Sequence, residues 1–259
     1  MRIALGVEYD GTQYCGWERQ RHCVSVQETL ERSLSDIANH PVTTTCAGRT
    51  DSGVHAWGQV VHFDTESKRE PHAWVRGTNA RMAADVAVRW AQVVDEHFHA
   101  RFSAERRRYR YIILNSKARS ATLHDRVTWH HEPLDHELMH RAVQALIGTH
   151  DFSGYRASRC QARSPVRTVF SAEVVRHGEG ISMEITANAF LQHMVRNIMG
   201  VLLAIGAGRA DVAWAGEVLE GRDRTLGGMT ANPSGLYLAE VRYPDEFRLP
   251  GPPITSGLW

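Results

Sequence analysis

The residues with the clearest chemical potential lie in one stretch, GRTDSGVHA, at residues 48–56. It holds a single carboxylate, Asp51, with Arg49 two residues before it and His55 four residues after it. A nearby cation keeps a carboxylate ionised. Glycoside hydrolysis usually takes two carboxylates, so a solitary ionised acid is better suited to nucleophilic attack or proton abstraction. Taken alone, Asp-Ser-Gly is more typical of an ordinary turn, because these residues favour turns for conformational reasons.

The elements that must position this stretch follow the ferredoxin-like order β-α-β-β-α-β. Ser25 and Glu28 form a capping box that opens a helix, and Pro71 is suited to the first turn of a second helix. The stretch itself lies between two expected strands. The expected elements are strand 2–11, the helix that opens at Ser25, strands 42–48 and 58–65, helix 71–82 and strand 85–94.

The second half repeats this order more loosely and predicts a second domain. Its first strand, residues 106–115, places Tyr109 and Tyr111 on one face and Arg108 and Arg110 on the other. We therefore predict an α+β protein with domains at residues 1–103 and 104–259. The expected elements are strands 106–115, 166–177, 181–188 and 235–243, with helices 135–147, 190–206 and 211–220.

Composition sets limits on the class of protein. The content of 42% hydrophobic and 23% charged residues is ordinary for a globular chain, and the longest apolar run, residues 198–208, is shorter than a bilayer span requires. The first residues show no signal peptide, and the four cysteines contain no CxxC pair. These features predict a cytoplasmic protein without a membrane segment, and with reduced thiols.

The basic residues are unusual in kind, although the net charge is only +1. Lys68 and Lys117 are the only lysines among 30 basic residues, so arginine supplies the rest. Arginine makes bidentate contacts to phosphate and stacks on bases, although a preference for arginine codons explains the composition at least as well. The arginines gather at residues 18–21, 105–110 and 156–167, which is a pattern suited to a shaped, charged ligand.

Two other functions need to be weighed. HELMH at residues 136–140 matches the HExxH zinc motif, but its His and Glu residues fall on the polar side of the expected helix and no third ligand follows at the usual spacing. Surface histidines are therefore the favoured interpretation, and no metal is expected. A non-catalytic RNA-binding module of the RRM type would carry an RNP1 run, which the sequence lacks.

Several segments together resemble transfer-RNA pseudouridine synthases of the TruA type. They occur in that family's order and cover nearly the whole chain: YDGTQYCGW, SVQETLERSL, AGRTDSGVHAWGQVVHF, FHARFSA, RRYRYIILN, DFSGYR and ANAFLQHMVRNIMG. The resemblance implies two ferredoxin-like halves whose sheets merge into one mainly antiparallel sheet, with helices packed on it and the active site in a central cleft. It also implies a homodimer that isomerises uridine at positions 38, 39 and 40 of the tRNA anticodon arm, without cofactor or metal.

The resemblance also assigns roles to residues. Asp51 matches the catalytic aspartate, which attacks the nucleoside or assists glycosidic cleavage. Arg49 matches the arginine that supports the flipped-out base, Tyr109 the tyrosine that stacks on the target uracil, and Arg196 the arginine paired with the catalytic carboxylate. The positions that match tRNA-contacting regions are Arg69, Phe98, His99, Ala100, Arg101, Phe102, Lys117, His130, Arg159, Cys160, Gln161, Ala162 and Arg163.

Two positions depart from the family's usual pattern. Ser52 stands where alanine is commoner, and Glu18 stands where the family usually has glutamine after Gly-Trp. Neither departure removes a catalytic group. Glu18 adds a negative charge near a basic loop.

Overall fold

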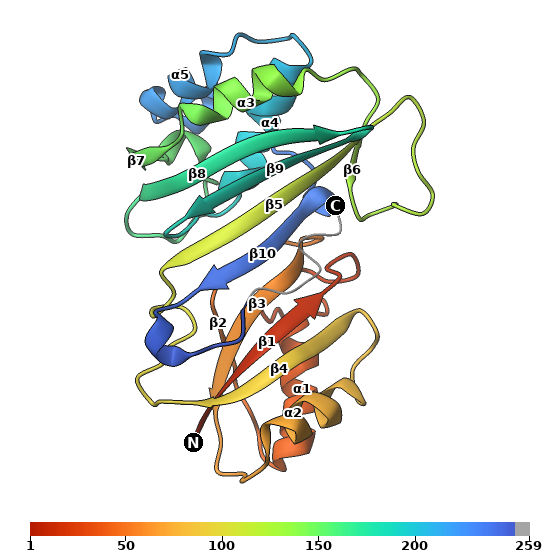
Figure 1. The fold of residues 1–259 in the computed structure, drawn as a ribbon, viewed down its shortest axis with the longest axis vertical. Coiled ribbons are helices and arrows are strands. Elements are labelled where there is room, and N and C mark those ends of the chain that lie inside the picture. Colours follow the sequence, from red (N-terminus) through yellow and green to blue (C-terminus); the bar gives the residue numbers. More distant parts are fainter. Residues whose placement is uncertain (252–259) are drawn as a thin grey trace. The chain divides into compact units, whose positions relative to one another are not determined.

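The computed structural model describes residues 1–251 and divides into two compact units (Figure 1). Unit 1 consists of Met1–Arg106 and the segment that begins at Tyr237, and unit 2 consists of Arg107–Leu236. The chain thus returns to unit 1 after unit 2. The predicted division into residues 1–103 and 104–259 does not include this second segment of unit 1. Each unit has a mainly antiparallel sheet with helices, which confirms the predicted α+β class.

Unit 1 has its sheet in the order β4-β1-β3-β10, with β2 paired to β3. β1 is central to three antiparallel strands, because Ala4 lies opposite His62 of β3 and Gln92 of β4. β10 runs parallel to β3, with Tyr237 opposite His55. The elements are β1 (Arg2–Tyr9), α1 (Val26–Ala38), β2 (Thr45–Cys46), β3 (His55–Asp64), α2 (Pro71–Asn79), β4 (Val86–Val94) and β10 (Leu236–Arg242).

The two helices of unit 1 begin where the sequence predicts. The Ser25 side chain accepts a hydrogen bond from the Glu28 amide and caps α1, which buries Leu30 and Leu34. Pro71 occupies the first turn of α2, where its missing amide hydrogen costs nothing. The helices pack against each other and α2 packs on β4, so their apolar faces close one side of the sheet.

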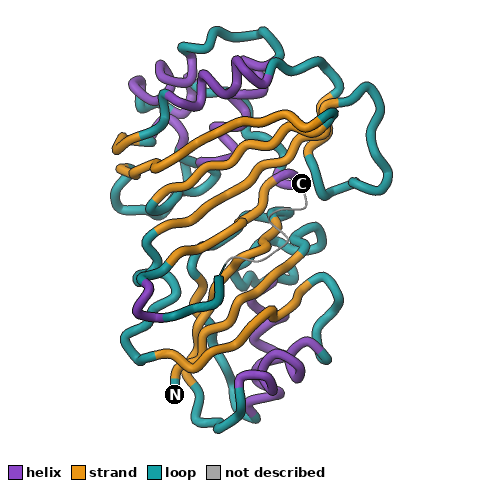
Figure 2. Tube along the Cα trace, viewed as in Figure 1, coloured by secondary structure: helices purple, strands orange, loops and turns teal. Residues whose placement is uncertain are grey.

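Unit 2 has the strand order β5-β9-β8-β7, all antiparallel, with β6 parallel to β5. α3 packs on β8 and on α4 (Figure 1). A long loop, residues 116–127, joins β5 to β6 (Figure 2). The elements are β5 (Arg106–Asn115), β6 (Thr128–His130), α3 (His136–Gln144), β7 (Gly148–Asp151), β8 (Val166–His177), β9 (Gly180–Ala187), α4 (Met194–Gly206) and α5 (Trp214–Gly221).

The structure differs from the sequence-based expectations in a few places. β6 and β7 were not predicted, since strands of three and four residues are too short to show an alternating pattern. A disulfide joins Cys15 to Cys23, so the prediction of four reduced thiols is wrong for this pair, whereas Cys46 and Cys160 are free. The Cys15 amide donates a hydrogen bond to the Val24 carbonyl, which brings the two cysteines together. Because the two cysteines do not form a CxxC pair, no local pattern indicated this contact.

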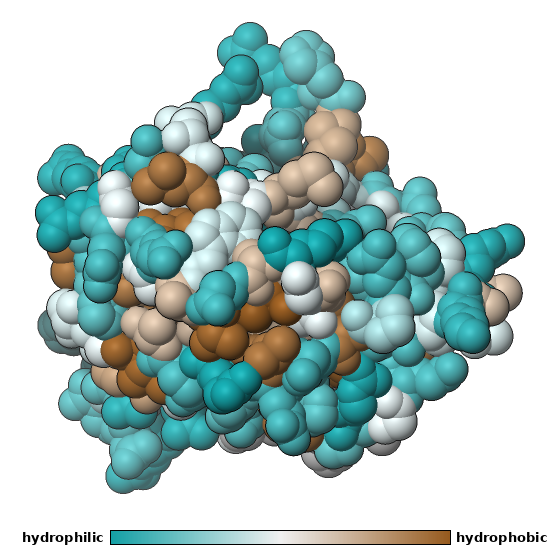
Figure 3. All heavy atoms as spheres, turned by 90° about the horizontal axis from the view of Figure 1, so that it is seen from above, coloured by the Kyte–Doolittle hydropathy of each residue, from teal (hydrophilic) through white to brown (hydrophobic). Residues whose placement is uncertain are grey.

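The surface mixes polar and apolar side chains. The face seen from above in Figure 3 is largely hydrophilic at its edges, with a group of hydrophobic residues near its centre. Single exposed apolar residues are normal on globular proteins. Among residues 1–251, every helix is too short or too polar to cross a bilayer. The merging of the two sheets and the central cleft stay predictions.

Candidate active site at the Asp51 loop

Asp51 lies in a tight turn between β2 and β3. The Val54 amide donates a hydrogen bond to the Asp51 carbonyl (3.1 Å) and closes a four-residue turn. Gly53, at φ +75°, supplies the positive φ that a type II turn requires at its third position. The turn interpretation of Asp-Ser-Gly is therefore correct as geometry. It is also compatible with a chemical role, because the turn fixes the backbone from which a half-buried carboxylate projects.

Tyr14 holds one side of this turn through its backbone carbonyl. That carbonyl accepts hydrogen bonds from the Gly53 amide (3.3 Å) and the Ser52 hydroxyl (3.2 Å). The Tyr14 side chain is fixed in turn, since its hydroxyl donates to the Asp85 carboxylate at 2.8 Å. Burial, together with that carboxylate, raises the pKa of Tyr14 to about 12. The hydroxyl therefore stays protonated as a donor at neutral pH.

Thr50 is held from two directions. Its carbonyl accepts a hydrogen bond from the Trp17 amide (3.0 Å), and its hydroxyl lies 2.8 Å from the Tyr9 hydroxyl in the buried interior. Gly16, at φ +89°, lies directly against the loop: a Cβ added there would lie 2.5 Å from the Thr50 carbonyl oxygen and 3.0 Å from the Asp51 carbonyl carbon. Only glycine allows such a close approach of two backbones.

The start of the loop is held by Gln59 of β3. Its side-chain amide donates to the Gly48 carbonyl (2.7 Å), and its oxygen accepts from the Gly48 amide (3.4 Å). Gln59 is fully buried, and a buried polar group is costly unless it is hydrogen-bonded. These two bonds satisfy the amide and fix the position at which the loop leaves β2.

Arg49 forms an ion pair with Glu18. Its Nη2 lies 2.6 Å from the Glu18 Oε1, and the two side chains are 53% and 50% exposed. Glu18 is the position that departs from the glutamine expected in the family. The departure therefore contacts one of the residues to which the resemblance assigns a role.

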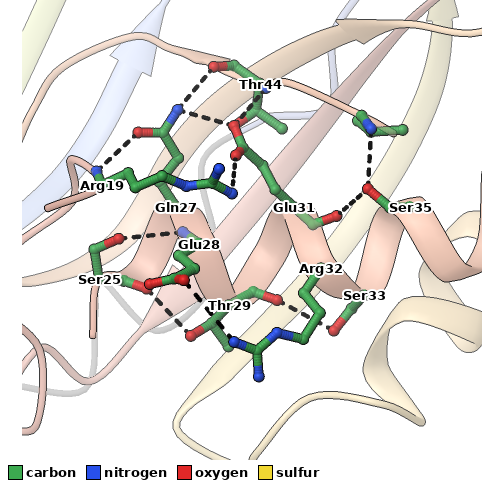
Figure 4. Close-up of polar contacts among 11 residues, drawn as sticks. Arg19, Ser25, Gln27, Glu28, Thr29, Glu31, Arg32, Ser33, Ser35 and Thr44 are labelled. Atoms are coloured by element: carbon green, nitrogen blue, oxygen red, sulfur yellow. Dashed lines mark hydrogen bonds and ion pairs between the residues drawn. The ribbon is translucent and has the colours of Figure 1, made fainter. Parts of the chain in front are cut away.

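A buried network fixes the segment next to Glu18 onto α1 (Figure 4). The Glu31 carboxylate accepts hydrogen bonds from the Thr44 amide (2.7 Å) and the Gln27 side chain (2.9 Å). It also pairs with the Arg19 guanidinium at 2.9 Å. This carboxylate thereby ties the chain leading into β2 and the segment at Arg19 to the same helix.

His55, the other titratable group of the stretch, is part of the support. Its ring is fully buried and stacks on Tyr237 of β10, with centroids 4.6 Å apart. Its Nδ1 lies 3.0 Å from both the Gly11 amide and the Asp10 carboxylate, so it accepts from the amide or, when protonated, donates to Asp10. Burial opposes ionisation of Asp10, but hydrogen bonds from His55 and Thr12 outweigh it and hold the pKa of that carboxyl well below its usual range.

Tyr109 and Arg196 lie in unit 2. Tyr109 is on β5, and its ring packs edge-on against Phe190 with centroids 5.0 Å apart. Arg196 is on α4, where its Nε donates to the Ala231 carbonyl (2.9 Å) and its carbonyl accepts from the Ala231 amide (3.1 Å). Each residue is thus held by a neighbour within its own unit.

The arginines around Tyr109 have structural partners. Arg110 Nε donates to Glu184 of β9 at 2.6 Å, and Arg108 Nη1 lies 3.2 Å from the same carboxylate. Arg107 donates to the Asn188 carbonyl at 2.7 Å. These three guanidinium groups are therefore hydrogen-bonded within unit 2, although the single Glu184 carboxylate offsets only one of their charges.

The expected tRNA-contacting segment at residues 98–102 has buried and exposed members. Phe98 and Ala100 are fully buried in a core cluster with residues of β1 and β3. The His99 and Phe102 rings stack at 4.3 Å, and the Arg101 guanidinium lies 5.6 Å from the Phe102 centroid. The side chains of His99, Arg101 and Phe102 are the ones that can reach a ligand.

The remaining expected contact residues are spread over both units. Arg156 shapes the segment at residues 159–163, because its guanidinium donates to the carbonyls of Cys160 (2.7 Å) and Ala162 (2.8 Å). Cys160 is partly buried and accepts a hydrogen bond from the Gln192 amide at 3.4 Å. His130 is on β6, where burial lowers its pKa. The exposed members of the set are Arg69, Lys117, Arg159, Gln161 and Arg163.

The HExxH match lies on α3. His140 is half-buried, and its Nδ1 accepts a hydrogen bond from the Val174 amide of β8 at 3.2 Å. This bond fixes α3 against the sheet, a structural role that the surface-histidine interpretation did not contain. In the part of the chain that the structure describes, no group of three or more His, Cys, Asp or Glu residues is placed to hold a metal ion.

Sequence reasoning missed the residues that hold the loop, chiefly Tyr9, Tyr14 and Gln59. The Gln59 signal was available, because a glutamine followed by an apolar run in an expected strand indicates a buried polar group that needs a partner. Tyr14 gave no such signal, since its contact to the loop is made by its backbone carbonyl.

Comparisons with known proteins identify relatives of this chain. The family model described as tRNA pseudouridine synthase matches residues 6–103 and 142–244. A protein of Pseudomonas aeruginosa described as tRNA pseudouridine synthase A is 58% identical over 262 residues, which is 99% of this chain and 92% of its own length. One of Aeromonas hydrophila with the same description is 56% identical, covering 100% of this chain and 96% of its own.

The comparison with solved structures is far more distant. A chain from a Cbf5-Nop10-Gar1 complex aligns with 78% of this chain and 45% of its own length, at 12% identity and a TM-score of 0.33. That similarity is too low to define the fold.

Proposed function

Because this chain belongs to the tRNA pseudouridine synthase family, we propose that it converts uridine to pseudouridine at positions 38, 39 and 40 of the tRNA anticodon arm. Isomerisation of uridine in tRNA is the activity of the family. The observation that best supports the proposed mechanism is the setting of Asp51. It is the only acid in residues 48–54, and the turn that carries it is held by Tyr14, Trp17 and Gln59.

The proposed reaction needs one well-placed acid. The bond from C1′ to N1 breaks, the base rotates, and a bond from C1′ to C5 forms, while C5 loses a proton and N1 gains one. Atoms and electrons balance within the nucleoside, so the reaction is an isomerisation. Asp51 attacks C1′ or assists glycosidic cleavage, and both roles use the ionised carboxylate.

The base must first leave its stack, at a cost of a few kcal/mol. Arg49 supports the flipped-out nucleotide, since a guanidinium can fill the vacated space and bind phosphate. Tyr109 stacks on the uracil and removes the C5 proton, and Arg196 pairs with the Asp51 carboxylate. These roles follow the family assignment, as do the homodimer, the cytoplasmic location and the absence of a metal or cofactor.

The proposed function also requires groups that bind RNA, and exposed cations and a stacked aromatic pair supply them. Arg69, Arg159 and Arg163 offer guanidinium groups to the backbone. Phe102 is exposed and stacks on the partly buried His99, so it offers an aromatic ring of the kind on which bases stack. Sequence-independent contacts of this type position the RNA, and the site at Asp51 then acts on the extruded base.

The experiment that tests the mechanism compares Asp51→Asn with Ser52→Ala, using tRNA labelled with tritium at C5 of uridine. Tritium is released only when C5 loses its hydrogen. Asp51→Asn retains the shape of the loop but loses the negative charge, so the rate should fall by about 10² or more with an unchanged melting temperature. Ser52→Ala removes one hydrogen bond to Tyr14 and should stay within a few-fold of wild type. Activity of Asp51→Asn within tenfold of wild type would contradict the assignment.

The target positions are tested separately with tRNA in which cytidine replaces the uridines at 38, 39 and 40. We expect no tritium release from this substrate, and release restored by a single uridine at any of the three. Undiminished release would show that the enzyme acts elsewhere in tRNA.

A further inference from the structure

The ion pair between Arg49 and Glu18 points to a role for Glu18 in the reaction. Arg49 is the only basic residue in residues 48–54, and its Nη2 lies 2.6 Å from the Glu18 Oε1. Both side chains are about half exposed, at 53% and 50%. The cation assigned to the RNA is therefore already bound to an acid of this chain, at a place that RNA can reach.

The backbone around Glu18 is fixed on both sides. The preceding residue, Trp17, donates its amide to the Thr50 carbonyl at 3.0 Å and accepts from the Gln27 amide at 3.0 Å. The following residue, Arg19, donates its amide to the Gln27 side chain at 3.1 Å. The Glu18 carboxylate thus projects from a segment that contacts both α1 and the Asp51 loop, so it stays next to Arg49.

Among the residues that the structure describes, Arg49 is the cation that forms an ion pair with Glu18. Arg19 is the neighbouring base, but its guanidinium pairs with Glu31 at 2.9 Å. When a phosphate takes Arg49, Glu18 is left as an anion close to another anion. These two like charges repel each other, and the repulsion opposes binding of the phosphate.

The ion pair between Arg49 and Glu18 contributes little to the stability of the fold. The same exposure to water allows Arg49 to exchange Glu18 for another anion. Exposed ion pairs contribute little to protein stability, since water solvates both charges well. The consequence of the contact is therefore expected in RNA binding, where one carboxylate competes with one phosphate for the same guanidinium.

We propose that Glu18 is a positioning residue that holds Arg49 in the free enzyme and releases it to an RNA phosphate, so that it lowers the affinity for tRNA. This role rests on the proposed function, in which Arg49 contacts the RNA. An RNA that does not bring a phosphate to Arg49 leaves the pair intact and gains nothing from this cation. Glu18 thereby makes the contribution of Arg49 depend on correct docking.

The test measures tRNA affinity of wild type and Glu18→Gln across a series of salt concentrations. Glutamine has the same shape without the charge, so Arg49 becomes a free cation that releases a counterion when it meets phosphate. The slope of log K against log salt should become steeper by about 0.7–0.9, the contribution of one phosphate contact. At low salt the affinity should rise about threefold to tenfold, with a lower KM and kcat within twofold. A purely structural role would instead lower the melting temperature and kcat.

Three control variants make the test specific. Glu18→Asp keeps the charge and should keep the wild-type slope. Glu28→Gln removes the same charge from an exposed pair with Arg32 on α1 and should leave the slope unchanged. In an Arg49→Ala background, Glu18→Gln should no longer change the slope.

Two results would overturn the role: an unchanged slope in Glu18→Gln, or an equal change in the Arg49→Ala background, which would indicate general repulsion of RNA. Failure of the proposed function is seen independently, because wild type would then release no tritium from the anticodon arm.

Discussion

Replacing Gly16 with alanine should disable the enzyme by displacing the Asp51 loop. Gly16 has φ +89°, where a residue with a Cβ loses about 1–2 kcal/mol. The new Cβ would also lie 2.5 Å from the Thr50 carbonyl oxygen and 3.1 Å from the Ser52 amide nitrogen. These are backbone atoms that cannot rotate away, so the loop must shift by roughly 0.5–1 Å. A misplacement of about 1 Å can cost 10²-fold in rate.

The matched control is Gly178→Ala in the turn between β8 and β9. Gly178 has φ +59°, and an added Cβ would meet nothing within 4 Å, so this variant has the backbone strain without the collision. We expect Gly178→Ala to lose about 1–2 kcal/mol of unfolding free energy with normal turnover. Gly16→Ala should lose more stability and about 10²-fold in single-turnover tritium release. Equal turnover of the two variants would refute the role of the close approach in placing Asp51.

Two further predictions concern stability. Burial lowers the pKa of His62 to about 4, and its Nδ1 accepts a hydrogen bond from the Ala100 amide. Between pH 6.5 and 4 the unfolded chain therefore binds more protons than the folded protein does. On acidification through that window, the free energy of unfolding in urea should fall by about 1–3 kcal/mol more in wild type than in His62→Asn, and equal losses would exclude this residue as a cause. Glu31→Gln should lower the free energy of unfolding by about 2–3 kcal/mol. The carboxylate only accepts hydrogen bonds, whereas the side chain of glutamine both donates and accepts, so it satisfies the Thr44 amide and the rest of the buried network less well. A cost no larger than that of Glu28→Gln, measured by the same unfolding, would contradict this estimate.

Local signals in the sequence were enough to place most of the elements. Ser25 and Pro71 marked the starts of α1 and α2, because the chemistry of a helix start depends on a few neighbouring residues. The strand at residues 106–115 was found with its bounds intact, since its inward residues alternate. β6 and the disulfide from Cys15 to Cys23 were missed, because each depends on a partner brought close only by the folded chain.

A candidate site could be proposed from the sequence, but the residues that support it could not. The motif around Asp51 named the acid and the cation, but the pairing of Arg49 with Glu18 joins residues that no local pattern connects. Similarly, the segment at residues 98–102 could be matched to RNA contacts as a block, whereas only the fold separates the buried Phe98 from the exposed Phe102. Which side chain of a segment faces outward is decided by packing against distant strands.

The parallel pairing of β10 with β3 has a consequence for how the protein is made on the ribosome. Tyr237 lies opposite His55 and stacks on its ring, yet it is synthesised only after all of unit 2 has been translated. Nascent domains fold as units in the order of their emergence, so unit 2 can close while unit 1 still lacks β10. The residue that begins β3, immediately after the Asp51 turn, gains its aromatic support last. A ribosome-bound chain that has not yet released β10 should therefore lack this aromatic support beside the Asp51 loop.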